Sequence, residues 1–245
     1  MVVPDKTKVA QSPKSQIISK VLSPALQLWL KAQVEEVDAL HLQILCSDRQ
    51  ILNGNIPHVS IAASRAIYQG LHLSQIQIEG RNIRFNLGQV LKGQPLRLLE
   101  SVAVTGQLVM AECDLQASLA SSLFSNALTE FLNQLLHSEQ ITHQTLTLTK
   151  IIWRKIEINT GKIKLIGTFT DTSLTPEAIM IEAGIQLVAG NLLRLHPLEI
   201  KTDSSEAPIL KLNEFWLDLG SEVNIFELTL AQGQLMCNAQ LNVLP

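Results

Sequence analysis

Residues 234–244, QLMCNAQLNVL, alternate polar and apolar side chains almost without interruption. In an extended chain successive side chains point to opposite faces, so a period of two predicts a strand that buries one face and exposes the other. The buried face would carry Leu235, Cys237, Ala239, Leu241 and Val243, and the exposed face Gln234, Met236, Asn238, Gln240 and Asn242.

The same period recurs along most of the chain. Its segments end at turn signals such as Asn53-Gly54-Asn55, Gly80-Arg81-Asn82 and Thr160-Gly161, which favour tight antiparallel connections. Short strands with turns at this spacing indicate a sandwich, a barrel or a long curled sheet. The other expected strands lie at 40–46, 59–63, 71–78, 83–85, 102–115, 146–148, 156–158, 163–169, 178–190, 192–200, 209–219 and 223–231.

Two segments change to a helical period. Between Ser15 and Glu36 apolar residues recur every three or four positions, and Pro24 divides this segment into a short helix and a longer one. A second helix is expected over 118–137, and 87–91 forms at most a short helical turn. The apolar side of the second helix carries Leu119, Leu123, Leu128, Phe131, Leu132, Leu135 and Leu136.

These elements predict an α+β protein in which antiparallel strands predominate. Residues 1–14 are polar and include two prolines, so we expect a flexible tail followed by a single domain over 15–245. The order helix, strand, turn, strand occurs twice, which raises the hypothesis of two αββ-type halves, 15–117 and 118–245.

Composition and charge exclude several classes of protein. Apolar residues make up 46% of the chain and charged residues 17%, which is enough to fill a core and argues against disorder. The net charge of −3 argues against nucleic acid as a partner, because binding to it needs a basic surface. Residues 1–34, with five lysines and one aspartate, carry +4 against −7 for the remainder. This segment either approaches anionic headgroups or is the solvated start of a helix.

No recognisable catalytic or metal-binding motif is present. The chain lacks GxSxG, HExxH, CxxC, GxGxxG and Walker sequences, and its six histidines have no ligand spacing. Its three cysteines, Cys46, Cys113 and Cys237, are far apart, which is typical of reduced, buried thiols in an intracellular compartment. We therefore expect no enzyme activity, no cofactor and no metal.

The expected location follows from two further features. The N-terminus has no apolar region of a secretory signal, and no apolar run approaches the roughly 18 residues that span a bilayer. We expect a protein that is cytoplasmic or peripheral on the cytoplasmic side of a membrane.

Two groups of charged residues are candidate sites. Arg81, Arg84 and Arg97 surround one turn and the following loop. Their guanidinium groups would either pair with a phosphate headgroup or discourage association at an edge strand. Glu112 and Asp114 would share one strand face, as paired carboxylates do in some glycosidases, although adjacent solvated acids explain the spacing better.

A further pattern is formed by Leu52-x-Gly54, Ser64-Arg65-Ala66-x-Tyr68-x-Gly70-Leu71 and Gly80-x-Asn82-Ile83, and it extends through residues 126–132, NALTEFL. These segments resemble a family of uncharacterised proteins common in cyanobacteria. That family is grouped with the lipomannan-elongation-factor-A-like (LmeA-like) phospholipid-binding proteins of mycobacteria. The resemblance covers most of the chain and brings no catalytic residues with it.

The resemblance implies a phospholipid-binding protein whose partner is a lipid or a membrane surface. The mycobacterial relatives are similar to tubular lipid-binding (TULIP-like) proteins, in which a strongly curved antiparallel sheet wraps a helix and leaves an apolar tunnel. Acyl chains would then lie between the sheet and one or two amphipathic helices. Those relatives are exported, whereas we expect no signal peptide in this chain, so their envelope role cannot simply be carried across. The lining candidates, for each of which core filling is the alternative, are Leu22, Leu26, Trp29, Leu128, Phe131 and Leu132.

Two other functions stay open. A structural or interaction scaffold would have a fully packed core and an exposed apolar patch for a protein partner. A hydrolase without a recognisable motif would show a polar cleft in which a histidine meets a carboxylate.

Overall fold

The computed structural model describes residues 34–90, 97–138, 151–170, 176–203 and 207–245, together with Lys31, Lys92 and Gln94. The predicted tail at 1–14 and the lining candidates Leu22, Leu26 and Trp29 lie outside the described residues.

One antiparallel sheet contains six strands in the order β1-β2-β3-β4-β12-β11. Its strands therefore come from both ends of the sequence, because the C-terminal hairpin pairs with β4. The strands are β1 (Glu36–Leu45), β2 (Asn55–Tyr68), β3 (Leu71–Arg84), β4 (Val102–Ala111), β11 (Val223–Ala231) and β12 (Gln234–Val243). The hypothesis of two αββ-type halves stays a prediction.

The second sheet has the order β10-β8-β7-β6-β5, and β9 pairs with β8 beside β10. All of its pairings are antiparallel. Its strands are β5 (Ile151–Asn159), β6 (Lys162–Thr170), β7 (Pro176–Ala189), β8 (Leu192–Thr202), β9 (Leu210–Leu212) and β10 (Phe215–Asp218). The prediction of a mostly antiparallel α+β protein is confirmed.

The described helices are short except for one. They are α2 (Asp48–Leu52), α3 (Leu87–Val90), α4 (Glu112–Ser118) and α5 (Ser122–Ser138). Helix α5 confirms the helix predicted over 118–137. The strand predicted to continue to residue 115 was wrong, because β4 ends at Ala111 and the chain enters α4.

The turn predicted at residues 80–82 was also wrong, since β3 runs through it without a break. Asn82 takes a left-handed conformation (φ 53°) inside the strand, which an asparagine tolerates better than most residues. The β2–β3 hairpin instead turns at Gln69 and Gly70, both with positive φ.

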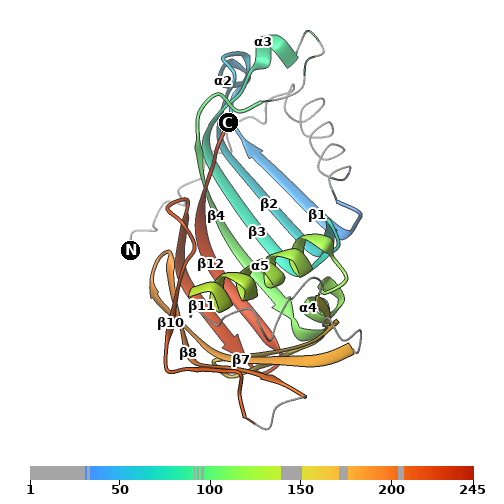
Figure 1. Ribbon diagram of the computed structural model, residues 1–245. Helices are drawn as coiled ribbons and strands as arrows, with labels where there is room; N and C mark the ends of the chain where they lie inside the picture. Colours follow the sequence, from blue (N-terminus) through green and yellow to red (C-terminus); the bar gives the residue numbers. More distant parts are fainter. Residues whose placement is uncertain are drawn as a thin grey trace, which may run out of the picture.

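The main core lies where the two sheets meet α5. In the view of Figure 1, α5 passes in front of the six-stranded sheet. Its buried face packs against the inner face of the second sheet and against the ends of β4, β11 and β12. We call this end of the molecule the base. Six apolar residues there are completely inaccessible to solvent: Leu132, Leu135, Ile158, Ile179, Leu198 and Ile200.

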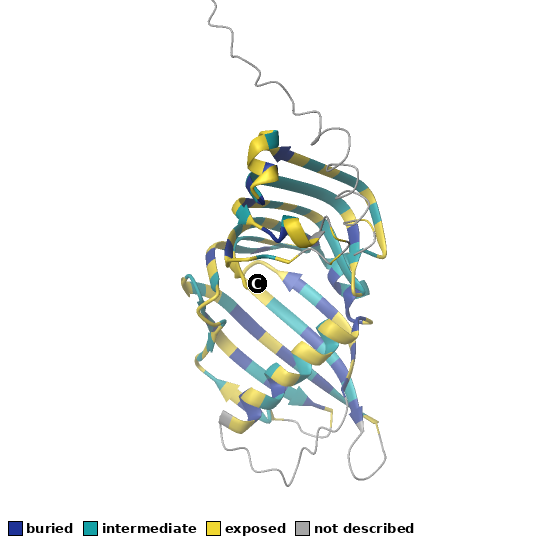
Figure 2. Ribbon diagram, turned by 90° about the horizontal axis from the view of Figure 1, so that it is seen from above, coloured by how far each residue is buried: buried dark blue, intermediate teal, exposed yellow. Residues whose placement is uncertain are grey.

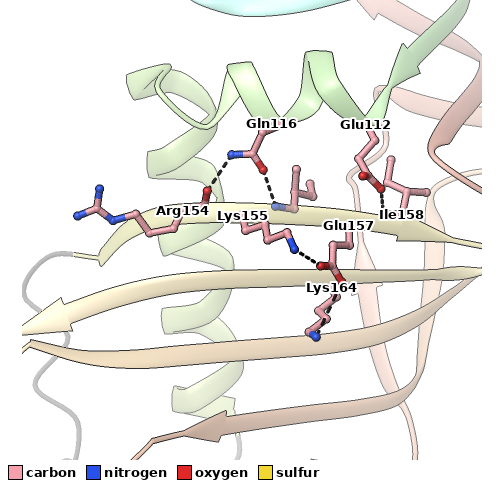
Figure 3. A network of polar contacts seen from close by, with 8 residues as sticks. Glu112, Gln116, Arg154, Lys155, Glu157, Ile158 and Lys164 are labelled. Carbon is pink, nitrogen blue, oxygen red and sulfur yellow. Dashed lines mark hydrogen bonds and ion pairs between the residues drawn. The ribbon is translucent and has the colours of Figure 1, made fainter.

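Helix α4 closes the edge of β5 with side chains in place of a neighbouring strand (Figure 3). The Gln116 amide donates to the carbonyl of Arg154 (2.8 Å) and accepts from the N–H of Ile156 (3.0 Å). The Glu112 carboxylate accepts from the N–H of Ile158 at 2.7 Å. Four helical residues advance about 6 Å and two strand residues about 6.7 Å, so an i, i+4 pair matches alternate N–H groups of a strand.

The opposite side of α4 closes the start of β3. Ser118 Oγ accepts from the N–H of His72 at 2.8 Å, and the Asp114 carboxylate accepts from the Ser74 hydroxyl. This segment of β3 has no strand partner on that side, because the β3–β4 ladder begins only at Gln75. The two i, i+4 pairs lie about 200° apart around the helix, so α4 joins the two sheets by satisfying an edge of each.

Candidate functional site

The six-stranded sheet carries a continuous aliphatic surface on one side. Strand register brings alternate apolar residues of all six strands into three rows across the sheet. None of the eighteen residues in these rows carries a charge, an amide or a hydroxyl group on a side chain. We call this surface the aliphatic face. Its rows are Leu40-Ala63-Ile76-Leu108-Cys237-Leu228, Leu42-Ile61-Ile78-Gly106-Ala239-Ile225 and Ile44-Val59-Gly80-Val104-Leu241-Val223.

The aliphatic face is not packed as a core is. Of its eighteen residues, Ile44, Gly80 and Ile225 are buried, Leu241 is 47% exposed, and the others are half-buried. In Figure 2 the strands beside α2 and α3 are mostly of intermediate burial. An aliphatic surface of this extent without full cover is the feature that an apolar ligand or partner needs.

Both ends of the aliphatic face are anchored by packed clusters. The main core holds one end, where Leu108 packs against the buried residues of the base. A small cluster under α2 holds the other end. Its buried members are Ile44, Ile51, Ile56 and Phe85, with Leu42, Cys46, Val59, Ile83 and Leu87 around them.

Gly106 lies in the central row, on one of the two strands at the middle of the sheet. A glycine inside a strand leaves the pleat without a side chain, so a ligand can approach the backbone there. A Cβ added at this position would lie 3.6 Å from the carbonyl oxygen of Gln77, which is ordinary contact. The position therefore has room for a larger side chain.

The other side of the same sheet is polar. One row across it consists of Gln43, Ser60, Glu79, Thr105 and Gln240. His58 Nε2 lies 3.5 Å from the Glu79 carboxylate on this side, and both side chains are partly exposed. The six-stranded sheet is therefore amphipathic, with its apolar residues on the aliphatic face and its polar residues on the other side.

Two thiols lie at the aliphatic face. Cys237 belongs to its first row, and Cys46 packs against the small cluster under α2. Burial raises the pKa of the Cys237 thiol, because a low-polarity environment disfavours the thiolate. Burial and the nearby Asp48 carboxylate raise the pKa of Cys46. The raised pKa values of both thiols thus indicate that this surface is of low polarity.

The lining candidates on the second helix lie at the base. Leu132 is completely buried in the main core, and Leu128 and Phe131 pack against that core half-buried. The ring of Phe131 meets that of Phe215 edge-on, with centroids 6.2 Å apart. These contacts give all three residues a packing role, and whether any of them also lines a lipid site stays a prediction.

The headgroup candidates lie at the opposite end, around the connection between β3 and β4. Arg84 pairs with Glu100 at 2.7 Å, and Arg81 Nη2 lies 3.8 Å from the Glu79 carboxylate. Arg97 is exposed, and its backbone N–H donates to the Asn86 side chain at 2.7 Å. The structure thus brings the three arginines to one end of the sheet, and their part in headgroup binding stays a prediction.

A hollow of about 620 Å³ lies beside α4, lined by Glu112, Cys113, Gln116, Arg154, Lys155, Ile156 and Ile166. The polar side chains of Glu112 and Gln116 are engaged with the edge of β5, and Lys155 pairs with Glu157 at 2.5 Å (Figure 3). The prediction that Glu112 and Asp114 share one strand face was wrong, because they lie on α4 and their carboxylates point to opposite sides of that helix. These carboxylates hold the sheets together.

Within the described ranges, no three His, Cys, Asp or Glu side chains come together in a way that would hold a metal ion. In the same part of the chain no helix combines the length and hydropathy needed to cross a bilayer.

Comparison with known proteins identifies a family. A model of LmeA-like phospholipid-binding proteins matches residues 14–240, which is nearly the whole chain. No curated protein and no solved structure matches the chain significantly. The chain belongs to the LmeA-like phospholipid-binding family.

Proposed function

We propose that this protein is a non-catalytic carrier that holds the acyl chains of a phospholipid against the aliphatic face. The observation that carries the proposal is a half-buried, uncharged surface spanning all six strands, in a chain of a phospholipid-binding family. Five strand spacings of about 4.8 Å make this surface about 24 Å wide. An extended acyl chain can therefore lie on it without meeting a polar side chain.

The magnitude of apolar burial shows what the aliphatic face alone would achieve. Full removal of a methylene from water contributes about 0.8 kcal/mol. A methylene with only one side on the aliphatic face would gain about half of that value, so ten of them would gain about 4 kcal/mol. That free energy corresponds to a dissociation constant of about 1 mM. Tight retention would require a second apolar surface over the same chain.

The helical segment predicted from the sequence at 15–36, a short helix and a longer one divided at Pro24, is the candidate for that cover, and it carries the lining candidates Leu22, Leu26 and Trp29. Those residues lie outside the described ones. The resulting arrangement, a sheet and a helix enclosing acyl chains, would be TULIP-like, and the arginines around the β3–β4 connection would lie near the headgroup.

Native mass spectrometry of the purified protein, followed by extraction and lipid identification, tests the proposal. We expect a stoichiometric phospholipid that survives purification. A lipid-free protein that also takes up no phospholipid from vesicles would contradict the proposal and favour a scaffold with a protein partner.

A substitution at Gly106 tests the location. Gly106→Leu should fill the centre of the aliphatic face without backbone strain, because an added Cβ makes only ordinary contact there. We expect phospholipid uptake to fall by about tenfold or more, since the loss of two or more methylene contacts is worth that factor. The matched control is Gln107→Leu, which adds the same side chain on the polar face one residue away. Equal uptake by the two variants would place the lipid elsewhere.

A further inference from the structure

Five exposed aliphatic side chains gather at the end of the six-stranded sheet that lies opposite α4 and α5. They come from the end of β1, from α2, from the β3–β4 connection and from the end of β12, which Figure 1 shows close together. The strand register places the ends of β1 and β12 at the same end of the sheet, because Leu45 opposes His58 near the start of β2 and Val243 opposes Val102 at the start of β4. We call this end the tip. The exposed fractions are 52% for Leu45, 64% for Leu52, 54% for Leu99, 41% for Val243 and 64% for Leu244.

Positively charged side chains surround these aliphatic residues. The tip carries five cations against the four carboxylates of Asp48, Glu79, Glu100 and Glu222, a net charge of +1, while the whole chain carries −3. Among the described residues, no ion pair involves the side chains of Arg49, Lys92 or Arg97. The five cations are Arg49, Arg81, Arg84, Lys92 and Arg97.

This combination fits one kind of surface. A single exposed leucine is common on soluble proteins, but five aliphatic side chains from four segments at one end form a patch. Aliphatic side chains ringed by cations match the boundary between acyl chains and anionic headgroups in a bilayer. A protein partner could meet the apolar part equally well, whereas the excess positive charge in an otherwise negative molecule favours the anionic membrane.

We propose that the tip docks on an anionic bilayer surface, with Leu52 and Leu99 entering the headgroup boundary and the arginines pairing with lipid phosphates. The aliphatic face begins at the tip, where Ile44 and Val59 belong both to it and to the small cluster under α2. Docking there would place the lipid-holding surface of the proposed function next to the membrane. The docking itself does not depend on that function.

Flotation with vesicles tests the proposal. The full chain should bind vesicles of phosphatidylcholine containing phosphatidylglycerol and bind pure phosphatidylcholine weakly, and added salt should release it, since salt screens exposed charges beyond about 8 Å at physiological strength. The double variant Leu52→Glu, Leu99→Glu should lower partitioning by roughly tenfold or more, because it removes apolar contacts and two units of charge attraction.

The matched control is Ile152→Glu, Val188→Glu, which introduces the same charges at residues of the second sheet that are 46% and 49% exposed. It should bind as the unchanged protein does. Equal binding by both double variants, or equal binding to neutral and anionic vesicles, would overturn the proposal. A protein that dimerises through the tip, with vesicle binding unaffected by the tip variant, would assign this surface to self-association and also overturn it.

Uptake of a short-chain phosphatidylcholine below its micelle concentration separates this proposal from the proposed function. The tip variant should take up this monomeric lipid normally, while Gly106→Leu should not. Vesicle binding without monomer uptake would leave the docking proposal standing and contradict the carrier function.

Discussion

The base and the aliphatic face are built from the same kinds of side chain but differ in what covers them. At the base, Leu135 and Ile158 are completely buried between two sheets and α5. On the aliphatic face, Ile61 and Ile78 lie in the middle of a six-stranded sheet and remain half-buried. The difference teaches that the position of a residue in a sheet does not make it core. A second layer does, and in the described structure that layer covers only one end of the six-stranded sheet.

Truncation of one side chain in each region gives the largest expected difference. Leu135→Ala should lower the free energy of unfolding by about 2–5 kcal/mol, because the substitution leaves a cavity in a packed core. Ile78→Ala should lower it by about 1 kcal/mol or less, since its half-exposed side chain loses few contacts. Denaturant unfolding measures both values. Equal losses would show that the aliphatic face is packed like the base.

Substitution of an α4 side chain that bonds to the edge of β5 should give an intermediate loss of stability. Gln116→Ala removes the partner of the Ile156 N–H and of the Arg154 carbonyl, so we expect a loss of about 1–3 kcal/mol for the buried N–H and little for the exposed carbonyl. Melting temperature should fall by roughly 2–4 °C per kcal/mol in a chain of this size. The control Cys113→Ala changes the exposed neighbour on the same helix and should stay within about 0.5 kcal/mol. An unchanged melting temperature for Gln116→Ala would show that water replaces the amide.

Thiol reactivity gives the smallest effect and reports on the aliphatic face directly. Because burial raises the pKa of Cys237, its alkylation should need a higher pH in the folded protein than in urea. The unfolded state then ionises first, so these thiols lower stability as pH rises above their ordinary pKa of 9.0, and have no such effect below it. Single-cysteine variants monitored by mass spectrometry measure the rates. Added phospholipid should slow the alkylation of Cys237 and leave the alkylation rate of the exposed Cys113 unchanged. Slower alkylation of Cys113 with an unchanged rate at Cys237 would contradict the proposed site.

Much of the fold could be predicted from local patterns. Strand β11 begins and ends where the alternation predicts, and α5 follows the helical period of its leucines. Helix α2 was missed, although Ser47 and Gln50 form a capping box that could have indicated it. Helix α4 was taken for strand because its two i, i+4 polar pairs also look like alternation over a few residues. The role of these polar side chains is to bond to the edges of β3 and β5, and only the tertiary structure brings those edges next to α4.

The candidate site was predicted only in part. Alternation gave the apolar side of β12, including Cys237 and Ala239, but not the strand beside it. β12 pairs with its sequence neighbour β11 on one side and with the distant strand β4 on the other, and this long-range register with β4 creates the three rows. Leu128 and Leu132 of α5 were predicted to line the lipid site, because an apolar helical stripe has the same spacing whether it packs against a core or a ligand. The structure packs them against the base.

Photolabelling tests most directly whether acyl chains lie on the aliphatic face. A phosphatidylcholine with a diazirine in one acyl chain would be loaded into the protein, irradiated, and its adducts mapped by peptide mass spectrometry. The adducts should fall on β2, β3, β4 and β12, near Ile61, Ile78, Gly106 and Cys237, and should disappear in Gly106→Leu. Adducts confined to the second sheet, or to the polar side of the six-stranded sheet, would contradict the claim.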